Sequence, residues 1–158
     1  MVSQAADGHS LERPANVFEW RNEWSVGVDA MDQTHHEFVA CVGAMLEATD
    51  DALADALSAF VEHARRHFAE EDTAMRDTAY GSAGCHVDEH AAVLKSAQEV
   101  QVALRQGHRH VVRAFAAALA DWFPEHARVM DQGLARWLVQ RRLGGSPVAL
   151  RRRVGVPA

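Results

Sequence analysis

Hydrophobic residues recur along four segments of the chain at spacings that alternate between four and three. The four stripes are Met31, His35, Phe38, Val42 and Met45; Leu53, Leu57, Phe60, Ala64, His67 and Glu71; His86, His90, Val93, Ala97, Val100 and Leu104; and Phe115, Leu119, Trp122, His126, Val129 and Gly133. This spacing is typical of the core-facing side of helices that pack nearly parallel or antiparallel. Since no useful β-type alternation occurs, the pattern predicts an all-α protein.

Short turns separate these stripes. Glycine and small polar residues cluster at residues 48–51, 78–84 and 105–107. Short connections favour antiparallel neighbours, so we predict an up-down antiparallel four-helix bundle. We expect the bundle to span residues 18–140, after an N-terminal arm of residues 1–17 and before an Arg-rich C-terminal tail of residues 141–158.

Three local signals predict where the helices begin and bend. Asp29 is expected to cap the first helix, and Asp50 or Asp51 the second, because a carboxylate there accepts a hydrogen bond from a free backbone N–H. The fourth stripe contains Pro124, which lacks a backbone N–H. We expect it to kink this helix just before His126.

Each of the four stripes carries polar residues at positions where apolar ones belong. They are His35, His67, Glu71, His86, His90 and His126. A single buried histidine is explained by a backbone partner. Burying six unpaired polar groups, at a few kcal/mol each, would cost about as much as the roughly 5–15 kcal/mol that stabilise a whole domain. A metal centre would compensate, so the pattern predicts one.

Asp131 completes the candidate ligands and sets their number at seven. It follows His126 by five residues, about 140° around an α-helix, so we expect it to flank the stripe and to reach the centre from the side. Seven ligands are too many for one zinc. Between two six-coordinate irons, five imidazoles, two bridging carboxylates and one bridging oxide or hydroxide fill about eleven of twelve positions, leaving one for a diatomic ligand. The Glu-x-x-His pattern of ferritin-like di-iron proteins does not occur in the sequence.

The four motifs, in this order, resemble those of the hemerythrin family. They read DQTHHEF, HFAEE, HVDEH and HARVMD, and the leader FEWRNEWSVGVDAMD is also similar, so the resemblance covers about residues 18–138. The resemblance implies one iron bound by His86, His90 and His126, a second bound by His35 and His67, and bridges from Glu71 and Asp131. The second iron would keep the open position, where dioxygen would bind reversibly for storage, delivery or sensing, without catalysis.

Two alternatives stay open at this stage. The same ligands would serve a di-iron enzyme that reduces nitric oxide or peroxide, which needs a proton donor near the open iron, and His63 is the candidate. Alternatively, the centre would act as an oxygen or redox sensor that docks a protein partner through the Arg-rich tail.

The sequence departs from the family pattern at Thr34, where the family usually has Gln before the first ligand. This difference could change a hydrogen bond next to the ligands.

Several other residues near the motifs are assigned roles outside the metal site. We expect five histidines to be non-ligands: His9, His36, His63, His108 and His110. Glu70 and Asp72 are expected on a solvated helix face. Candidates for lining an oxygen pocket are Phe38, Phe68, Leu94 and Trp122. Cys41 and Cys85 are expected to be reduced thiols.

Charge and composition narrow the possible partners. The net charge is −6, and residues 1–131 carry −12, because six arginines and no acidic residue follow Asp131. Such an acidic chain is a poor nucleic-acid binder. It has neither the roughly 18–20-residue apolar run of a membrane span nor a signal-peptide pattern at its start. We therefore expect a cytoplasmic protein without a nucleic-acid or membrane partner. We also expect a monomer, and the resemblance implies dioxygen as its ligand.

Overall fold

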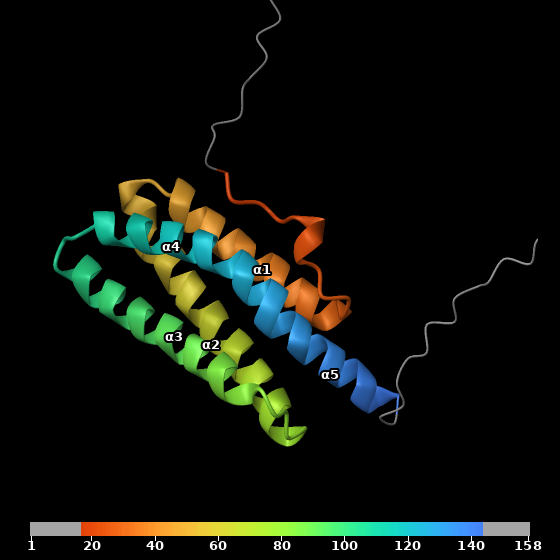
Figure 1. Ribbon diagram of the computed structural model, residues 1–158. Helices are drawn as coiled ribbons and strands as arrows, with labels where there is room; N and C mark the ends of the chain where they lie inside the picture. The colour runs from red at the N-terminus through yellow and green to blue at the C-terminus, as the bar shows by residue number, and fades with distance from the viewer. Residues whose placement is uncertain (1–16, 144–158) are drawn as a thin grey trace, which may run out of the picture.

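The computed structural model describes residues 17–143, which form helices joined by short turns (Figure 1). In chain order these are η1 (Asn22–Trp24), α1 (Asp29–Glu47), η2 (Asp50–Ala52), α2 (Leu53–Asp77), α3 (Ala83–Arg105), α4 (His110–His126), η3 (Ala127–Asp131) and α5 (Gln132–Arg142). No strand occurs within residues 17–143. The predicted all-α class is confirmed.

The long helices form a four-membered ring of packed neighbours. α1 packs against α2 and α4, and α3 packs against the same two helices. Consecutive helices run in opposite directions, and η3 and α5 extend α4 along the same column (Figure 1). The predicted up-down four-helix bundle is therefore confirmed, with its fourth member built from α4, η3 and α5.

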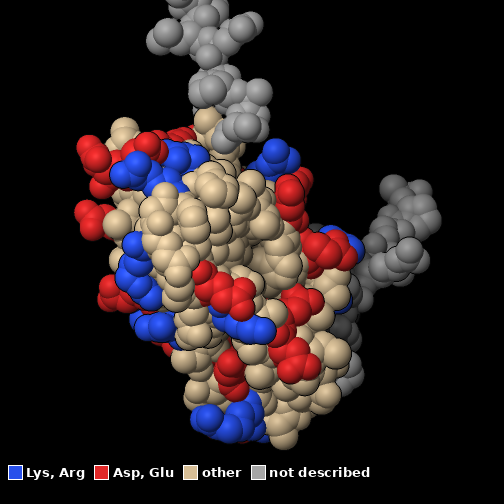
Figure 2. Space-filling model, turned by 90° about the vertical axis from the view of Figure 1, so that its left-hand side faces the viewer, with Lys and Arg blue, Asp and Glu red and all other residues tan. Residues whose placement is uncertain are grey.

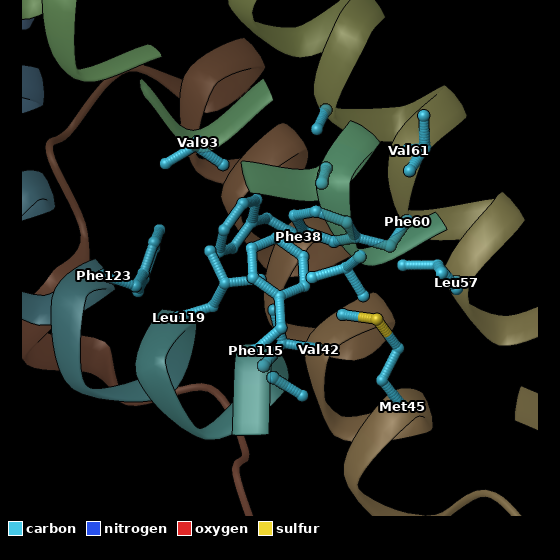
Figure 3. Packing of buried hydrophobic residues seen from close by; sticks show 14 of the residues in the cluster. Phe38, Val42, Met45, Leu57, Phe60, Val61, Val93, Phe115, Leu119 and Phe123 are labelled. Atoms are coloured by element: carbon cyan, nitrogen blue, oxygen red, sulfur yellow. The ribbon is translucent and has the colours of Figure 1, made fainter. Parts of the chain in front are cut away.

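The apolar core is divided into two clusters. The larger cluster contains Phe38, Phe60, Phe115 and Phe123 from α1, α2 and α4, which pack together in Figure 3. The smaller cluster comprises Val26, Val28, Met31, Met75, Leu134 and Ala135, and it joins the leader and α5 to the start of α1 and the end of α2. On each helix of the bundle, the polar residues of the stripes lie between these two clusters.

The predicted stripes match the buried positions well in the first three helices and fail late in the fourth. Only Leu104, at the end of the third stripe, is less than fully buried there. In the fourth helix Val129 is 48% exposed, whereas Asp131, Leu134 and Ala135 are buried. The reason is that η3 is a π-helix. Its wider turn changes which residues face the core, and an α-helical extrapolation cannot anticipate this.

The predictions for the helix starts were wrong. Asp29 is the first residue of α1 rather than its cap, and Asp50 and Asp51 lie inside η2. Pro124 lies within α4, and the π-helix η3 begins directly after His126, so the kink predicted at Pro124 stays a prediction.

Asp32, rather than Asp29, is the acidic residue whose carboxylate binds the chain just before α1. Its Oδ1 accepts a hydrogen bond of 2.7 Å from the backbone N–H of Val26, and its Oδ2 accepts one of 3.1 Å from that of Gly27. The Ser25 hydroxyl donates to the same carboxylate at 2.6 Å. Gly27 has φ +79°, which favours glycine. These bonds hold the leader against the bundle end.

Two features of the described residues concern possible partners: the hydropathy of the helices and the distribution of charge on one face. None of the described helices combines the length and hydropathy needed to cross a bilayer. On the face in Figure 2, acidic and basic side chains are interspersed. Arg141 and Arg142 of the predicted tail belong to α5, while residues 144–158 and most of the predicted arm fall outside the described residues.

Candidate metal centre

All seven predicted ligands converge at one level of the bundle, between the two apolar clusters. They are His35 from α1, His67 and Glu71 from α2, His86 and His90 from α3, His126 from α4 and Asp131 from η3. Every one of them is buried, and the most exposed, Glu71, is only 6% exposed. Packing of the helices therefore brings together residues that are far apart in the sequence, from His35 to Asp131.

The Glu71 carboxylate directs its two oxygens at different pairs of histidines. Oε1 lies 3.4 Å from Nε2 of His35 and 3.0 Å from Nε2 of His67. Oε2 lies 3.4 Å from Nε2 of both His86 and His90. A carboxylate with this placement suits a bridge between two metal ions.

Asp131 repeats this division from the opposite side. Its Oδ2 lies 3.2 Å from Nε2 of His35, whereas its Oδ1 lies 3.1 Å from Nε2 of His86 and 3.2 Å from Nε2 of His126. The cluster thus has two parts that share two carboxylates. We call them the two-histidine half (His35 and His67) and the three-histidine half (His86, His90 and His126).

The π-helix η3 explains how Asp131 reaches the centre. We predicted that Asp131 would flank the stripe, and this was wrong, because it is 1% exposed and faces the cluster directly. In a π-helix the backbone bonds run from residue i to i+5, so a residue five positions after His126 returns to the same face. Single π-turns inside α-helices occur frequently at functional sites.

The charges of the cluster stabilise one another in the protein without metal. Burial alone would raise the pKa of Glu71, but hydrogen bonding to His35, His67, His86 and His90 holds it well below its usual range. Burial alone would lower the pKa of His86, but hydrogen bonding to Asp131 and Glu71 raises it to about 9.

His35 and Asp131 follow the same logic. Burial would lower the pKa of His35, yet hydrogen bonding to Glu71 and the charge of Asp131 raise it. Burial and the charge of Glu71 would raise the pKa of Asp131, but hydrogen bonds with His126 and His86 lower it. Protons on the histidines thus supply part of the positive charge that these carboxylates require.

The inward atoms nevertheless lack enough hydrogen-bond partners. Several of the contacts between histidines and carboxylates are close but are not aligned as hydrogen bonds, so the buried atoms without an aligned partner include Nε2 of His86, His90 and His126, Oε2 of Glu71 and both carboxylate oxygens of Asp131. Such orphaned groups are rare in native proteins and require an explanation. Imidazole nitrogens and carboxylate oxygens within 4.8 Å of one another can bind a divalent metal, and the atoms fall into two such groups that share Glu71. The cluster is suited to a metal site.

Two further carboxylates contact the outer nitrogens of ligand histidines. Asp72 Oδ1 lies 2.7 Å from Nδ1 of His90, and Glu89 Oε2 lies 2.5 Å from Nδ1 of His126. We predicted a solvated face for Asp72, and this was wrong, whereas Glu70 is indeed exposed. Sequence reasoning missed Glu89. The signal that could have identified Glu89 is its position directly before the ligand His90, on the side of α3 that faces α4.

Aromatic rings enclose the histidines on the side of the larger cluster. Phe68 stacks on His90 with ring centroids 4.1 Å apart, and Trp122 stacks on His126 at 4.2 Å. The edges of Phe38 and Phe123 meet His67 and His35, with centroids 6.0 Å and 5.7 Å apart. Leu94 packs against the same cluster. Three of the four predicted lining residues thus contact ligands, and Phe123 was missed.

A cleft reaches the cluster from the other side. It has a volume of about 160 Å³ and lies between α1, α2 and α5. The lining consists of Ala30, Met31, Thr34, His67, Glu70, Glu71, Ala74, Leu134 and Leu138. No ligand of the three-histidine half other than the shared Glu71 contributes to this cleft, so it opens onto the two-histidine half.

The remaining described histidines and the cysteines belong to neither of the two groups of metal-binding atoms. His36 is exposed and stacks on Trp20, and His108 and His110 are exposed near the start of α4. His63 is buried beside His67 but belongs to neither group. His9 lies outside the described residues. Cys41 is half-buried, Cys85 is exposed, and both are free thiols.

Comparison with known proteins supports the resemblance seen in the four motifs. The family model for the hemerythrin HHE cation binding domain matches residues 26–138. A bacteriohemerythrin of Ralstonia nicotianae is 33% identical over 125 residues, which cover 79% of this chain and 91% of the relative. Bacteriohemerythrins of Pseudomonas paraeruginosa and Pseudomonas aeruginosa are each 25% identical over 118 residues, which cover 72% of this chain and 76% of each relative. The chain belongs to the hemerythrin HHE cation-binding family.

Proposed function

We propose that this protein binds dioxygen reversibly at a non-heme di-iron centre, for oxygen storage, delivery or sensing. The observation that carries this proposal is the unequal division of seven ligands around two shared carboxylates. The three-histidine half offers three nitrogens and two carboxylate oxygens. The two-histidine half offers only two nitrogens and two oxygens. Iron held by these residues would supply reversible binding of dioxygen, with His35 and His67 leaving the position for it.

The chain's own residues favour binding over turnover. Phe38, Phe68 and Phe123 surround the histidines with apolar rings that limit the access of water. A site that excludes water and protons protects a bound ligand from side reactions. The cleft provides a separate approach to the two-histidine half, and its walls are mostly apolar, which suits a neutral diatomic molecule.

The test combines iron content with optical spectra of the purified protein. We expect two irons per chain and visible absorption bands that bleach on deoxygenation and return with air. Protein loaded with zinc serves as the control, since zinc has no redox chemistry. Two irons with a spectrum that changes once and never returns would contradict reversible binding.

Filling the cleft is expected to slow ligand binding without changing the centre. In the Ala74→Phe variant a ring occupies the space above His67 and Glu71. The association rate of nitric oxide with the diferrous protein, measured by stopped flow, should fall several-fold while iron content stays the same. The matched control is Ala118→Phe, which fills a groove of about 240 Å³ between α3 and α4. Equal rates in both variants would rule out the cleft as the route.

The second candidate function is a di-iron reductase of nitric oxide or peroxide, and His63 is the observation that favours it. This residue is only 5% exposed, its Nε2 lacks a hydrogen-bond partner, and its ring lies 5.4 Å from that of His67 between centroids. Its Nδ1 lies 3.5 Å from the half-exposed carboxylate of Glu37. A path from solvent to the two-histidine half could pass through this pair.

The electrostatics of His63 nevertheless favour the carrier. Burial, followed by the neighbouring charge of His67, lowers the pKa of His63 to about 4. The imidazole is therefore neutral at pH 7 and a poor source of protons. We expect the His63→Phe variant to keep oxygen release unchanged, as measured by stopped-flow deoxygenation. Loss of nitric oxide or peroxide turnover in this variant, supplied with an external electron donor, would establish the enzyme instead.

A further inference from the structure

The two halves of the centre differ at the outer nitrogens of their histidines. In the three-histidine half, Nδ1 of His90 and His126 each face a carboxylate, at 2.7 Å and 2.5 Å, whereas Nδ1 of His86 has no hydrogen-bond partner among the described residues. In the two-histidine half, Nδ1 of His35 and His67 are buried and have no hydrogen-bond partner among the described residues. The carboxylates come from Asp72 and Glu89, neither of which points at the metal-binding atoms.

A carboxylate at Nδ1 changes what the imidazole offers a metal. It accepts the Nδ1–H, so the ring adopts the tautomer whose free lone pair is on Nε2. It also fixes the ring orientation and raises the basicity of Nε2. The inward nitrogens are placed accordingly, since Nε2 of His90 faces Glu71 and Nε2 of His126 faces Asp131.

Ring stacking restrains the same two histidines a second time. Phe68 lies nearly parallel to His90, with an interplanar angle of 8°, and Trp122 lies at 28° to His126. His67 has no stacked ring and lines the cleft instead. A preorganised ligand set binds metal with less loss of entropy than one whose rings are free to turn.

We propose that Asp72 and Glu89 are positioning residues that make the three-histidine half the tighter metal site, filled first and emptied last. The two-histidine half is then the exchangeable site, open to the cleft. This inference rests on the metal centre of the proposed function but not on its binding of dioxygen. It predicts that the two metals bind in separate steps.

The experiment is a calorimetric titration of the full-length metal-free protein with Zn²⁺. Wild-type protein is expected to bind two equivalents in two resolved steps. Asp72→Asn and Glu89→Gln keep the shape of each side chain but remove its charge, and each should weaken the first step by about 10–100-fold. The second step should be nearly unchanged, because the contacts of His35 and His67 are untouched.

Two further variants separate positioning from general effects. Asp88→Asn removes the same charge from an exposed position between His86 and His90 and should leave both steps as in wild type. Asp72→Glu keeps a carboxylate and should recover part of the affinity lost in Asp72→Asn. Thermal unfolding of each metal-free variant checks that it folds like wild type.

The outcomes distinguish this inference from the proposed function. A single cooperative step in wild type, or an equal weakening of both steps in Asp72→Asn and Glu89→Gln, would overturn the positioning role. Two steps with selective weakening of the first would support it, even if the iron protein fails to release and rebind dioxygen. That failure would overturn only the proposed function.

Discussion

Replacing Glu71 with alanine is expected to empty both halves of the centre at once. Its two oxygens face different halves, Oε1 toward His35 and His67 and Oε2 toward His86 and His90. Loss of this one side chain therefore removes a ligand from each metal. Iron content, measured on protein purified under the same conditions as wild type, should fall from two per chain to well below one.

The same substitution should destabilise the protein when no metal is bound. Glu71 is the buried negative partner of four imidazoles, and its loss removes the main support of the raised pKa of His35 and part of the support of the raised pKa of His86. Removal of one member of a buried charge pair typically costs about 3–5 kcal/mol. Urea unfolding of the metal-free proteins measures this difference.

Two control variants test the cause of these effects. Glu70→Ala changes the adjacent, exposed glutamate and should retain both irons and the wild-type stability. Glu71→Gln keeps the volume of the side chain but lacks the charge, so it separates a lost ligand from a cavity. If Glu71→Ala retained two irons per chain, Glu71 would not be the bridge.

The sequence predicted the fold and six of the seven candidate ligands from a local period, whereas Asp131 was included although it was expected beside the stripe. Along α1, α2 and α3 an α-helical register holds from end to end, so residues such as His35 and Glu71 could be placed on the core side by counting threes and fours. The polar residues on these stripes were informative because packing offers no other reason for them.

The failures around the centre have one physical cause, which is that their determinants are not local. The π-turn of η3 shifts the register of Asp131 and exposes Val129, and nothing in the motif HARVMD specifies a wider turn. Asp72 contacts His90 only because α2 and α3 approach within hydrogen-bond distance, and Glu89 contacts His126 only because α3 and α4 do. Such contacts depend on the rotation of neighbouring helices, which the period of one helix does not determine.

Removing the metal is expected to change the sign of the pH dependence of stability above pH 6.5. The metal-free protein should lose stability as pH rises, whereas the metal-loaded protein should keep or gain it. In the metal-free protein the folded-state pKa of His86 is raised to about 9, from an ordinary value of 6.5. The contribution of His86 to the free energy of unfolding is complete below pH 6.5 and is lost as pH rises through 9. A shift of this size corresponds to at most on the order of 3 kcal/mol. His35, whose pKa is also raised, acts in the same direction.

On the acid side the signs are opposite. The pKa values of Glu71 and Asp131 are lowered by their histidine partners, so their contribution is present above the ordinary carboxyl range and is lost as pH falls. Burial lowers the pKa of His63 to about 4 in the folded protein. The unfolded chain therefore takes up this proton first, and the folded state loses stability as pH falls from 6.5 toward 4. The metal-free protein should therefore be most stable near pH 6.5.

The loaded protein should behave differently because metal and protons compete for the same nitrogens. Each ligand histidine must be deprotonated at Nε2 to bind, so metal affinity rises with pH through this range. Thermal unfolding between pH 6.5 and 9, with and without a chelator, should show the metal-free protein losing stability while the loaded protein keeps or gains it. In Asp131→Asn the metal-free slope should flatten, because a main cause of the raised His86 pKa is gone. Parallel slopes in the loaded and metal-free proteins would mean that these histidines do not hold the metal.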